Sequence, residues 1–227
     1  MNLSRLRRRW LRPLVRDPLI LPFYVPSFLV FLGFGFITPV LPIYVESFEV
    51  SYRWVGLVLS AQAFGMLISD LPNGLLLRRV GHKRAMLLGI GTLVLARLAF
   101  SWAGSVSELL IYRLLSGFGM SLYGVARHAF VAGRAKAATR GRALALFGGL
   151  MRIGRFIGPL IGGYLAAALG LRYSFVVSGV VSALGVFFVV YFVPGRQSEK
   201  TAAVQVPTHT SGSPFLPMLR RQLDLLI

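Results

Sequence analysis

Four of the ionisable side chains inside long apolar runs of this sequence are candidates for chemistry. They are one acid, Asp70, and three arginines, Arg113, Arg152 and Arg155. An arginine at the centre of a bilayer costs at least about 2.5–3.5 kcal/mol, so such a residue should face a cavity or an opposite charge. We therefore take these four residues as candidates for binding a substrate and for coupling its movement to an ion.

The spacing of these residues suggests their chemistry. Arg152 and Arg155 are three residues apart and share one helix face. Such a pair suits a carboxylate or phosphate, although both side chains could equally reach the membrane surface or pair within the protein. Asp70 could carry a proton or form a structural ion pair with a basic neighbour, and Arg97 could extend outward along its helix. Uncharged side chains that could line the same cavity are Gln62, Tyr44 and Trp54.

Six apolar runs would position these residues. The chain has 227 residues, of which 56% are hydrophobic and 14% charged, whereas soluble domains have about 25% charged residues. Each run approaches the ~20 residues that a helix needs to cross a bilayer. The runs are Leu19–Val45, Trp54–Leu77, Arg84–Ala103, Glu108–Ala132, Arg142–Ala168 and Tyr173–Val193. The sequence therefore predicts an all-α integral membrane protein with a transmembrane domain over residues 19–193.

The flanking segments have a different composition. Residues 1–18 form a basic N-terminus, and residues 194–227 are a polar linker rich in Ser, Thr and Pro. We expect this linker to be flexible and cytoplasmic. Its last residues, "MLRRQLDLLI", could begin a seventh helix or lie as an amphipathic turn on the membrane.

The net charge of +18 is unevenly distributed along the chain. Basic residues precede the first run, separate the second from the third and the fourth from the fifth, and follow the sixth. The only basic residues in the opposite loops are Arg53 and Arg172. This positive-inside pattern predicts a multi-pass protein of the plasma (inner) membrane with both termini cytoplasmic. Because topology accounts for the basic residues, we expect no nucleic acid as a partner. Arg127 and His128, near the cytoplasmic end of the fourth run, are expected at the membrane interface, and a proton relay is the alternative role of His128.

The composition also argues against several classes of site. The sequence has no cysteine, no cluster of metal ligands, no nucleophile–base pair and no phosphate-binding loop of the Walker type. We therefore expect neither an enzyme nor a bound cofactor or metal.

The fifth run contains a strip of small residues. Gly154, Gly158 and Gly162 recur at every fourth position, so they lie on one side of a helix. Small residues let helices pack closely in membranes. Pro159 removes one backbone hydrogen bond and should bend the helix. Close packing and a bend at a fixed place would suit a helix that rocks during transport.

Four segments, in chain order, resemble the signature motifs of the major facilitator superfamily. They are "LGFGFITPVLP" with Pro39 and Pro42, "DLPNGLLLRRVGHKR" from Asp70, "LLIYRLLSGFG" with Arg113 and Gly117, and "GRFIGPLIGG" from Gly154 to Gly163. The first and last together resemble drug:proton antiporters of that superfamily. The resemblance implies that Arg113 takes part in substrate binding or proton coupling, and that the prolines and glycines serve helix packing and bending.

The second segment departs from the family pattern. By resemblance, it is a gating loop formed by Gly74, Arg78, Arg79, Gly81, Lys83 and Arg84. The acidic position of the motif is occupied by Arg78, which weakens the expectation that this loop forms the charge network of the family.

The resemblance also implies a function. Members of the family usually have twelve helices in two related halves, with the substrate bound between them, and this chain resembles the first half. We expect secondary active transport of a small molecule by alternating access, as proton-coupled efflux of drug-like or metabolite substrates. Alternatives are an organic-anion carrier, or a truncated or split half that is inactive without a second half. The expected partners are the substrate, protons, the lipid bilayer, and either a second copy or a separate C-terminal half.

Overall fold

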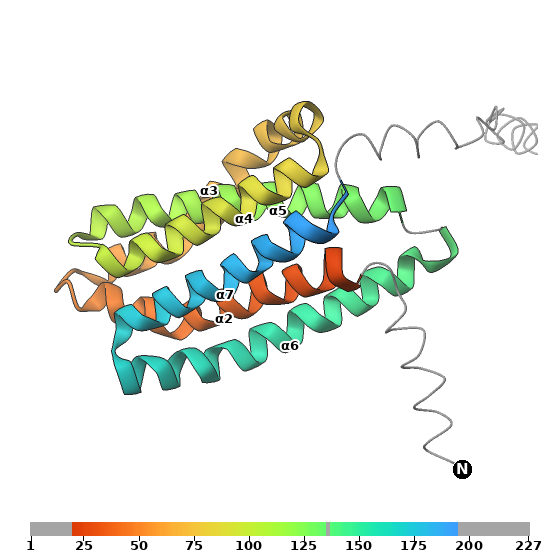
Figure 1. Cartoon of the computed structure of the whole chain (residues 1–227). Helices are drawn as coiled ribbons and strands as arrows, with labels where there is room; N and C mark the ends of the chain where they lie inside the picture. The colour runs from red at the N-terminus through yellow and green to blue at the C-terminus, as the bar shows by residue number, and fades with distance from the viewer. Residues whose placement is uncertain (1–19, 135–136, 195–227) are drawn as a thin grey trace, which may run out of the picture. The chain divides into compact units, whose positions relative to one another are not determined.

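The computed structural model describes residues 20–134 and 137–194, and most of these residues are helical (Figure 1). The elements are η1 (Ile20–Tyr24), α2 (Val25–Glu46), α3 (Tyr52–Val80), α4 (His82–Ala99), η2 (Phe100–Trp102), α5 (Val106–Arg134), α6 (Ala137–Leu169) and α7 (Leu171–Phe192). Six helices of the described residues are long and apolar enough to cross a membrane. The predicted all-α bundle of six transmembrane helices is confirmed. The basic segment 1–18 and the linker from residue 195 onward lie outside the described residues.

The helices pack in an order that differs from their order in the chain. The closest neighbours are α3 with α5, α5 with α4, α4 with α7, α7 with α2, and α2 with α6 (Figure 1). This order places α3 and α6 at the two ends of an arc. Helices α2, α3, α5 and α6 therefore border one face of the bundle, and α4 and α7 lie behind them.

Two glycines set the tight connections of the bundle. Gly81, between α3 and α4, has a φ of 80°, and Gly170, between α6 and α7, has a φ of 102°. Residues with a Cβ rarely adopt this conformation. Each glycine thus ends one helix and allows the next to begin within a single residue. Gly81, predicted as part of a gating loop, has at least this structural role.

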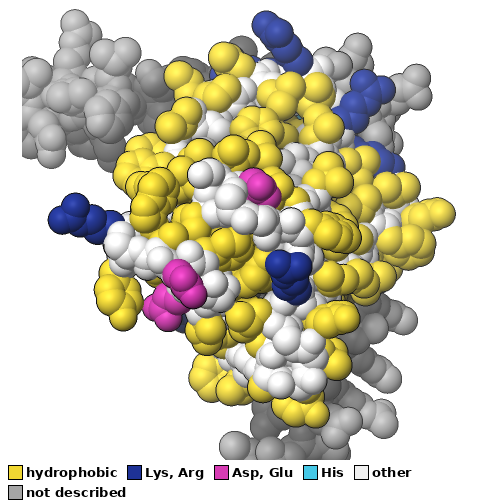
Figure 2. Space-filling model, turned by 90° about the vertical axis from the view of Figure 1, so that its left-hand side faces the viewer, with side chains coloured by type: hydrophobic (Ala, Val, Ile, Leu, Met, Phe, Trp, Pro, Cys, Tyr) yellow, Lys and Arg dark blue, Asp and Glu magenta, His cyan; other side chains and the backbone are white. Residues whose placement is uncertain are grey.

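The outer surface of the bundle is apolar, as a bilayer requires. On α3, Leu67 is 72% exposed and Leu71 is 79% exposed, and Phe156 on α6 is 77% exposed. Figure 2, which faces the end of the bundle with the α2–α3, α4–α5 and α6–α7 loops, shows hydrophobic side chains around much of this end. The membrane-facing sides need no further burial to be stable, because lipid is their solvent.

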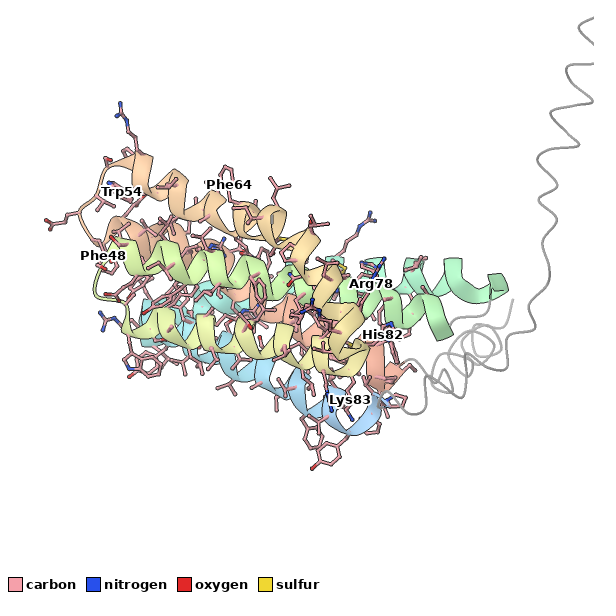
Figure 3. The ribbon with its side chains drawn as sticks, turned by 90° about the horizontal axis from the view of Figure 1, so that it is seen from above. Phe48, Trp54, Phe64, Arg78, His82 and Lys83 are labelled. Carbon is pink, nitrogen blue, oxygen red and sulfur yellow. The ribbon has the colours of Figure 1, made fainter. Side chains whose placement is uncertain are left out.

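The two ends of the bundle differ in side-chain chemistry. Phe48 and Trp54 lie at one end, and Arg78, His82 and Lys83 lie at the other (Figure 3). Aromatic residues favour membrane interfaces, and lysine and arginine favour the cytoplasmic side. The arrangement agrees with the charge asymmetry of the sequence.

Candidate functional site

A cavity of about 700 Å³ opens on the face bordered by α2, α3, α5 and α6. Its ionisable lining residues come from three helices: Asp70 on α3, Arg113, Arg127 and His128 on α5, and Arg155 on α6. The apolar part of the lining comprises Phe31, Phe34, Leu59, Ala63, Met66, Met120, Val125 and Met151. Apolar walls with a few polar groups are typical of sites for small molecules.

Arg113 lies at the base of this cavity. Its side chain is 8% exposed, and one of its terminal nitrogens donates a hydrogen bond to the side-chain oxygen of Gln62 on α3. Its Nε is buried without a hydrogen-bond partner among the described residues. An amide oxygen satisfies part of a guanidinium but does not neutralise it. Arg113 therefore keeps a positive charge that a ligand in the cavity can reach.

Arg127 is the most enclosed charge of the cavity lining. It is 4% exposed, and its guanidinium carbon lies 4.2 Å from the ring centre of Phe147, 5.3 Å from that of Tyr123 and 5.5 Å from that of Phe31. These rings belong to α6, α5 and α2. A desolvated cation on an aromatic face gains about 2 kcal/mol, so the aromatic cage offsets part of the cost of burying this charge.

The hydrogen bonds of Arg127 are incomplete. One terminal nitrogen donates to Nε2 of His128 over 3.2 Å, so that ring nitrogen must be the one without a proton. Nε and the other terminal nitrogen are buried with no partner among the described residues. Arg127 and His128, which the sequence predicts at the membrane interface, both line the cavity.

The structure separates the two arginines of α6. Arg155 lines the cavity, where its guanidinium carbon lies 5.3 Å from the ring centre of Phe31 and 5.8 Å from that of Phe34. Arg152 is exposed and is not part of the cavity lining. The predicted pair therefore does not face a common ligand in this conformation.

Asp70 belongs to a polar connection between α3 and α5. Its carboxylate accepts a hydrogen bond of 2.5 Å from the Ser121 hydroxyl, and this hydroxyl accepts one of 2.9 Å from the Asn73 amide. The same amide donates to the backbone oxygen of Phe118. Asp70 is itself exposed on the cavity side. The carboxylate is thus oriented by its own bundle and accessible from the cavity, as a proton-carrying group would need to be.

Arg97 is buried, contrary to the expectation that it extends outward. It is 2% exposed and donates to the Ser182 hydroxyl on α7 and to the backbone oxygen of Val30 on α2, the latter over 3.1 Å. The arginine side chain is long enough to reach from α4 to both α7 and α2. Arg97 therefore joins three helices and is not part of the cavity lining.

The basic loop between α3 and α4 lies at one end of the bundle (Figure 3). Lys83 donates a hydrogen bond of 2.6 Å to the backbone oxygen of Val190 near the end of α7. Arg78, Arg79 and Arg84 are exposed. A Cβ on Gly74 would meet open space, so no packing contact requires this glycine. Lys83, at least, holds α4 against α7 rather than facing the other cations.

The glycine strip of α6 packs against α2. A Cβ on Gly158 would lie 2.6 Å from the Cα of Gly35, one on Gly162 would collide with the backbone oxygen of Phe36, and one on Gly154 would lie 3.2 Å from the nitrogen of Leu32. Gly163 faces open space and takes no part in this contact. Pro159 lies within α6, and Pro39 and Pro42 lie within α2, without ending either helix.

A second close contact joins α3 and α5. A Cβ on Gly117 would collide with the backbone oxygen of Gln62, and one on Gly65 would collide with the backbone oxygen of Leu114. This contact brings Gln62 within reach of Arg113. Gly117, predicted from its motif as a packing residue, lies at the helix crossing that builds the base of the cavity.

Sequence reasoning missed the part that Arg127, Ser121 and Asn73 play in this region. A signal was present, because Arg113, Gly117, Ser121, Gly124 and Arg127 are spaced by three or four residues and share one face of α5. What the sequence could not provide was the aromatic cage, since its rings come from three helices far apart in the chain.

Comparisons with known proteins agree with this architecture. The family model described as Major Facilitator Superfamily matches residues 24–226. Multidrug resistance protein 2 of Bacillus subtilis is 28% identical over 196 residues, which are 86% of this chain and 48% of that protein. Quinolone resistance protein NorA of Staphylococcus aureus is 25% identical over 184 residues, covering 80% of this chain and 47% of that protein. The chain thus spans about half the length of these curated relatives.

Solved structures share the fold. A peptide transporter POT in complex with sulfate matches with a TM-score of 0.70 and 18% identity, covering 83% of this chain and 43% of that one. The human organic anion transporter MFSD10 matches with a TM-score of 0.64 and 20% identity, covering 76% and 46%. At these identities the likeness concerns the fold alone.

Proposed function

This chain belongs to the Major Facilitator Superfamily, and from that premise we propose that it forms one half of a secondary transporter that moves small amphipathic molecules out of the cell. The chain is a membrane transport protein and not an enzyme. The cavity carries the proposal, because it combines apolar walls with a few oriented charges on the face bordered by α2, α3, α5 and α6. A drug-like molecule would bury its rings against these walls and place its polar groups against Asp70 or the arginines.

Efflux as the direction of transport is inferred from the relatives. The names of two of them refer to multidrug resistance and quinolone resistance. The described helices form one wall of a site, and in this superfamily substrates bind between two six-helix halves. We therefore propose that the active species contains a second six-helix unit, either another copy of this chain or a separate C-terminal half.

Coupling to protons is the second part of the proposal. Asp70 is the one acid among the described cavity residues, and Ser121 holds its carboxylate in place. A carboxylate open to the cavity could take up a proton from one side of the membrane and release it on the other. We place the basic loop between α3 and α4 and both termini on the cytoplasmic side of the plasma (inner) membrane, as the positive-inside rule favours.

Transport by reconstituted protein tests this function. The full chain, alone and co-expressed with a C-terminal half from a relative, would be placed in proteoliposomes and assayed for uptake of a fluorescent quinolone driven by a pH gradient. We expect uptake that requires the gradient and that Asp70→Asn reduces at least tenfold. Arg53→Gln, an exposed change outside the cavity, serves as the control. Uptake that ignores the gradient would contradict proton coupling, and no uptake with either partner would contradict the transport function.

A further inference from the structure

Arg127 has unused hydrogen-bonding capacity. Its guanidinium has five N–H groups that point outward in the plane of the group. The rings of Phe31, Tyr123 and Phe147 lie within 5.5 Å of its carbon, and aromatic rings attract the cation without accepting conventional in-plane hydrogen bonds. One terminal nitrogen contacts His128, and Nε and the remaining terminal nitrogen have no partner among the described residues.

An unpaired buried cation is unfavourable in a bilayer. Leaving the donors of a buried charged group without partners forfeits the hydration that those donors have in water. In the described part of the chain no acidic side chain pairs with Arg127, and the carboxylate of Asp70 is already engaged by Ser121. The aromatic cage and the contact to His128 hold this guanidinium in place. The missing partner would therefore be supplied from the cavity that Arg127 lines.

The surroundings of Arg127 favour an anion. The described cavity lining has three arginines, Arg113, Arg127 and Arg155, against one carboxylate. Arg155 lies 5.3 Å from the centre of the Phe31 ring, and Arg127 lies 5.5 Å from the same centre, so both guanidinium groups contact one ring of α2. An anion bound there would meet two guanidinium groups, and its apolar part would lie along Phe34, Met66 and Met120.

We propose that the cavity binds an amphipathic organic anion, with Arg127 as the primary anchor for its carboxylate, sulfonate or phosphate group and Arg155 as the second cation. This substrate class rests on the proposed function of the cavity and refines it. Arginine binds such groups through its N–H donors, and Nε and one terminal nitrogen of Arg127 have no partner among the described residues. The aromatic cage supplies preorganisation, because the guanidinium needs little rearrangement to receive the ligand.

Two probes with the same ring system, one anionic and one neutral, test this proposal. The full chain in nanodiscs would be equilibrated with tritiated 2-naphthoate or with its neutral counterpart 2-naphthamide, and the two dissociation constants would be compared. We expect 2-naphthoate to bind about ten- to a hundredfold more tightly, which is the range for a hydrogen bond to a charged group. Equal affinities would overturn the anion proposal and leave the transport function standing. Binding of neither probe would count against both.

Variants assign the preference to Arg127. Arg127→Gln should bring the ratio of the two affinities close to one while 2-naphthamide still binds, and Arg127→Lys should restore part of the preference. Asp70→Asn should increase the affinity for 2-naphthoate several-fold, because it removes a like charge from the cavity. The control Arg53→Gln should leave the ratio unchanged. A preference that persists in Arg127→Gln would overturn the role of Arg127.

The proposal also remains testable if Arg127→Gln fails to fold. Arg155 is exposed, so Arg155→Gln should fold normally, and we expect it to reduce the preference by at least threefold. A ratio that changes in neither Arg155→Gln nor Asp70→Asn would overturn the proposal.

Discussion

Three buried arginines in this bundle are stabilised in three different ways. Arg97 donates to a hydroxyl and a backbone oxygen, Arg113 to an amide oxygen, and Arg127 is enclosed by aromatic rings. None of these partners carries a formal negative charge. The bundle therefore concentrates positive charge inside the membrane. Arg97 is not part of the cavity lining and joins three helices, whereas Arg113 and Arg127 line the cavity.

The contact between Arg97 and Ser182 can be tested by a double-mutant cycle. Ser182→Ala leaves a terminal nitrogen of Arg97 buried without its acceptor, and we expect it to reduce the free energy of unfolding by about 1.5–3 kcal/mol. In an Arg97→Met background, which has no such donor, the same change should cost less than about 1 kcal/mol. The measurement is equilibrium unfolding in detergent micelles with guanidinium chloride. The control is Ser60→Ala, because the Ser60 hydroxyl bonds within its own helix. If Ser182→Ala lowers the free energy of unfolding equally in both backgrounds, Arg97 and Ser182 are not coupled.

At the scale of the elements, closely packed helix pairs form the wall of the cavity. Glycines bring α6 against α2 and α5 against α3, and the cavity lies on the face that these pairs share. The contacts of Gly158 and Gly162 are between backbones. Any side chain there would push α6 away from α2, together with Arg155 and the ring of Phe147.

Two glycines of the same helix provide a matched test. Gly158→Ala should destabilise the protein by about 1–3 kcal/mol, because its Cβ would lie 2.6 Å from the Cα of Gly35. Gly163→Ala, five residues further along α6, should be neutral or stabilising by up to about 1 kcal/mol, because its Cβ meets open space and alanine favours helix. Unfolding of both variants under the same conditions compares them. Similar losses for the two would mean that the α2–α6 contact is looser than described.

The sequence predicted the elements well and the site in part. Length and hydropathy determine a transmembrane helix almost alone, so all six were placed within a few residues, and the repeat of Gly154, Gly158 and Gly162 indicated the packing face. The rotation of a helix within the bundle depends on its neighbours. For that reason the sequence could not show that Arg155 faces the cavity while Arg152 does not, or that Arg97 turns inward. The cage around Arg127 depends on rings from three helices, so no pattern within one segment of the sequence indicates it.

At the scale of the whole molecule, the two ends of the bundle differ in charge, and this difference should fix its orientation. Lys83 and the exposed side chains of Arg78 and Arg84 lie at the end where α3 meets α4. Insertion favours the cytoplasmic side for such clusters because positive residues resist translocation. If this end is cytoplasmic, the loop from Ser47 to Ser51 and the turn before α5 must lie outside.

The orientation can be measured by labelling single introduced cysteines. The chain has no cysteine of its own, so it contributes no background labelling. Ser51→Cys and Ser107→Cys, both exposed at the end of the bundle that has the α2–α3 and α4–α5 loops, should react with a membrane-impermeant maleimide added to intact cells. Gly133→Cys, exposed near the opposite end of α5 with open space around its Cβ, should react only after the cells are permeabilised. The reverse pattern would mean an inverted bundle. Labelling of all three positions in intact cells would mean a mixed orientation, and both results would contradict the assignment of the basic loop to the cytoplasm.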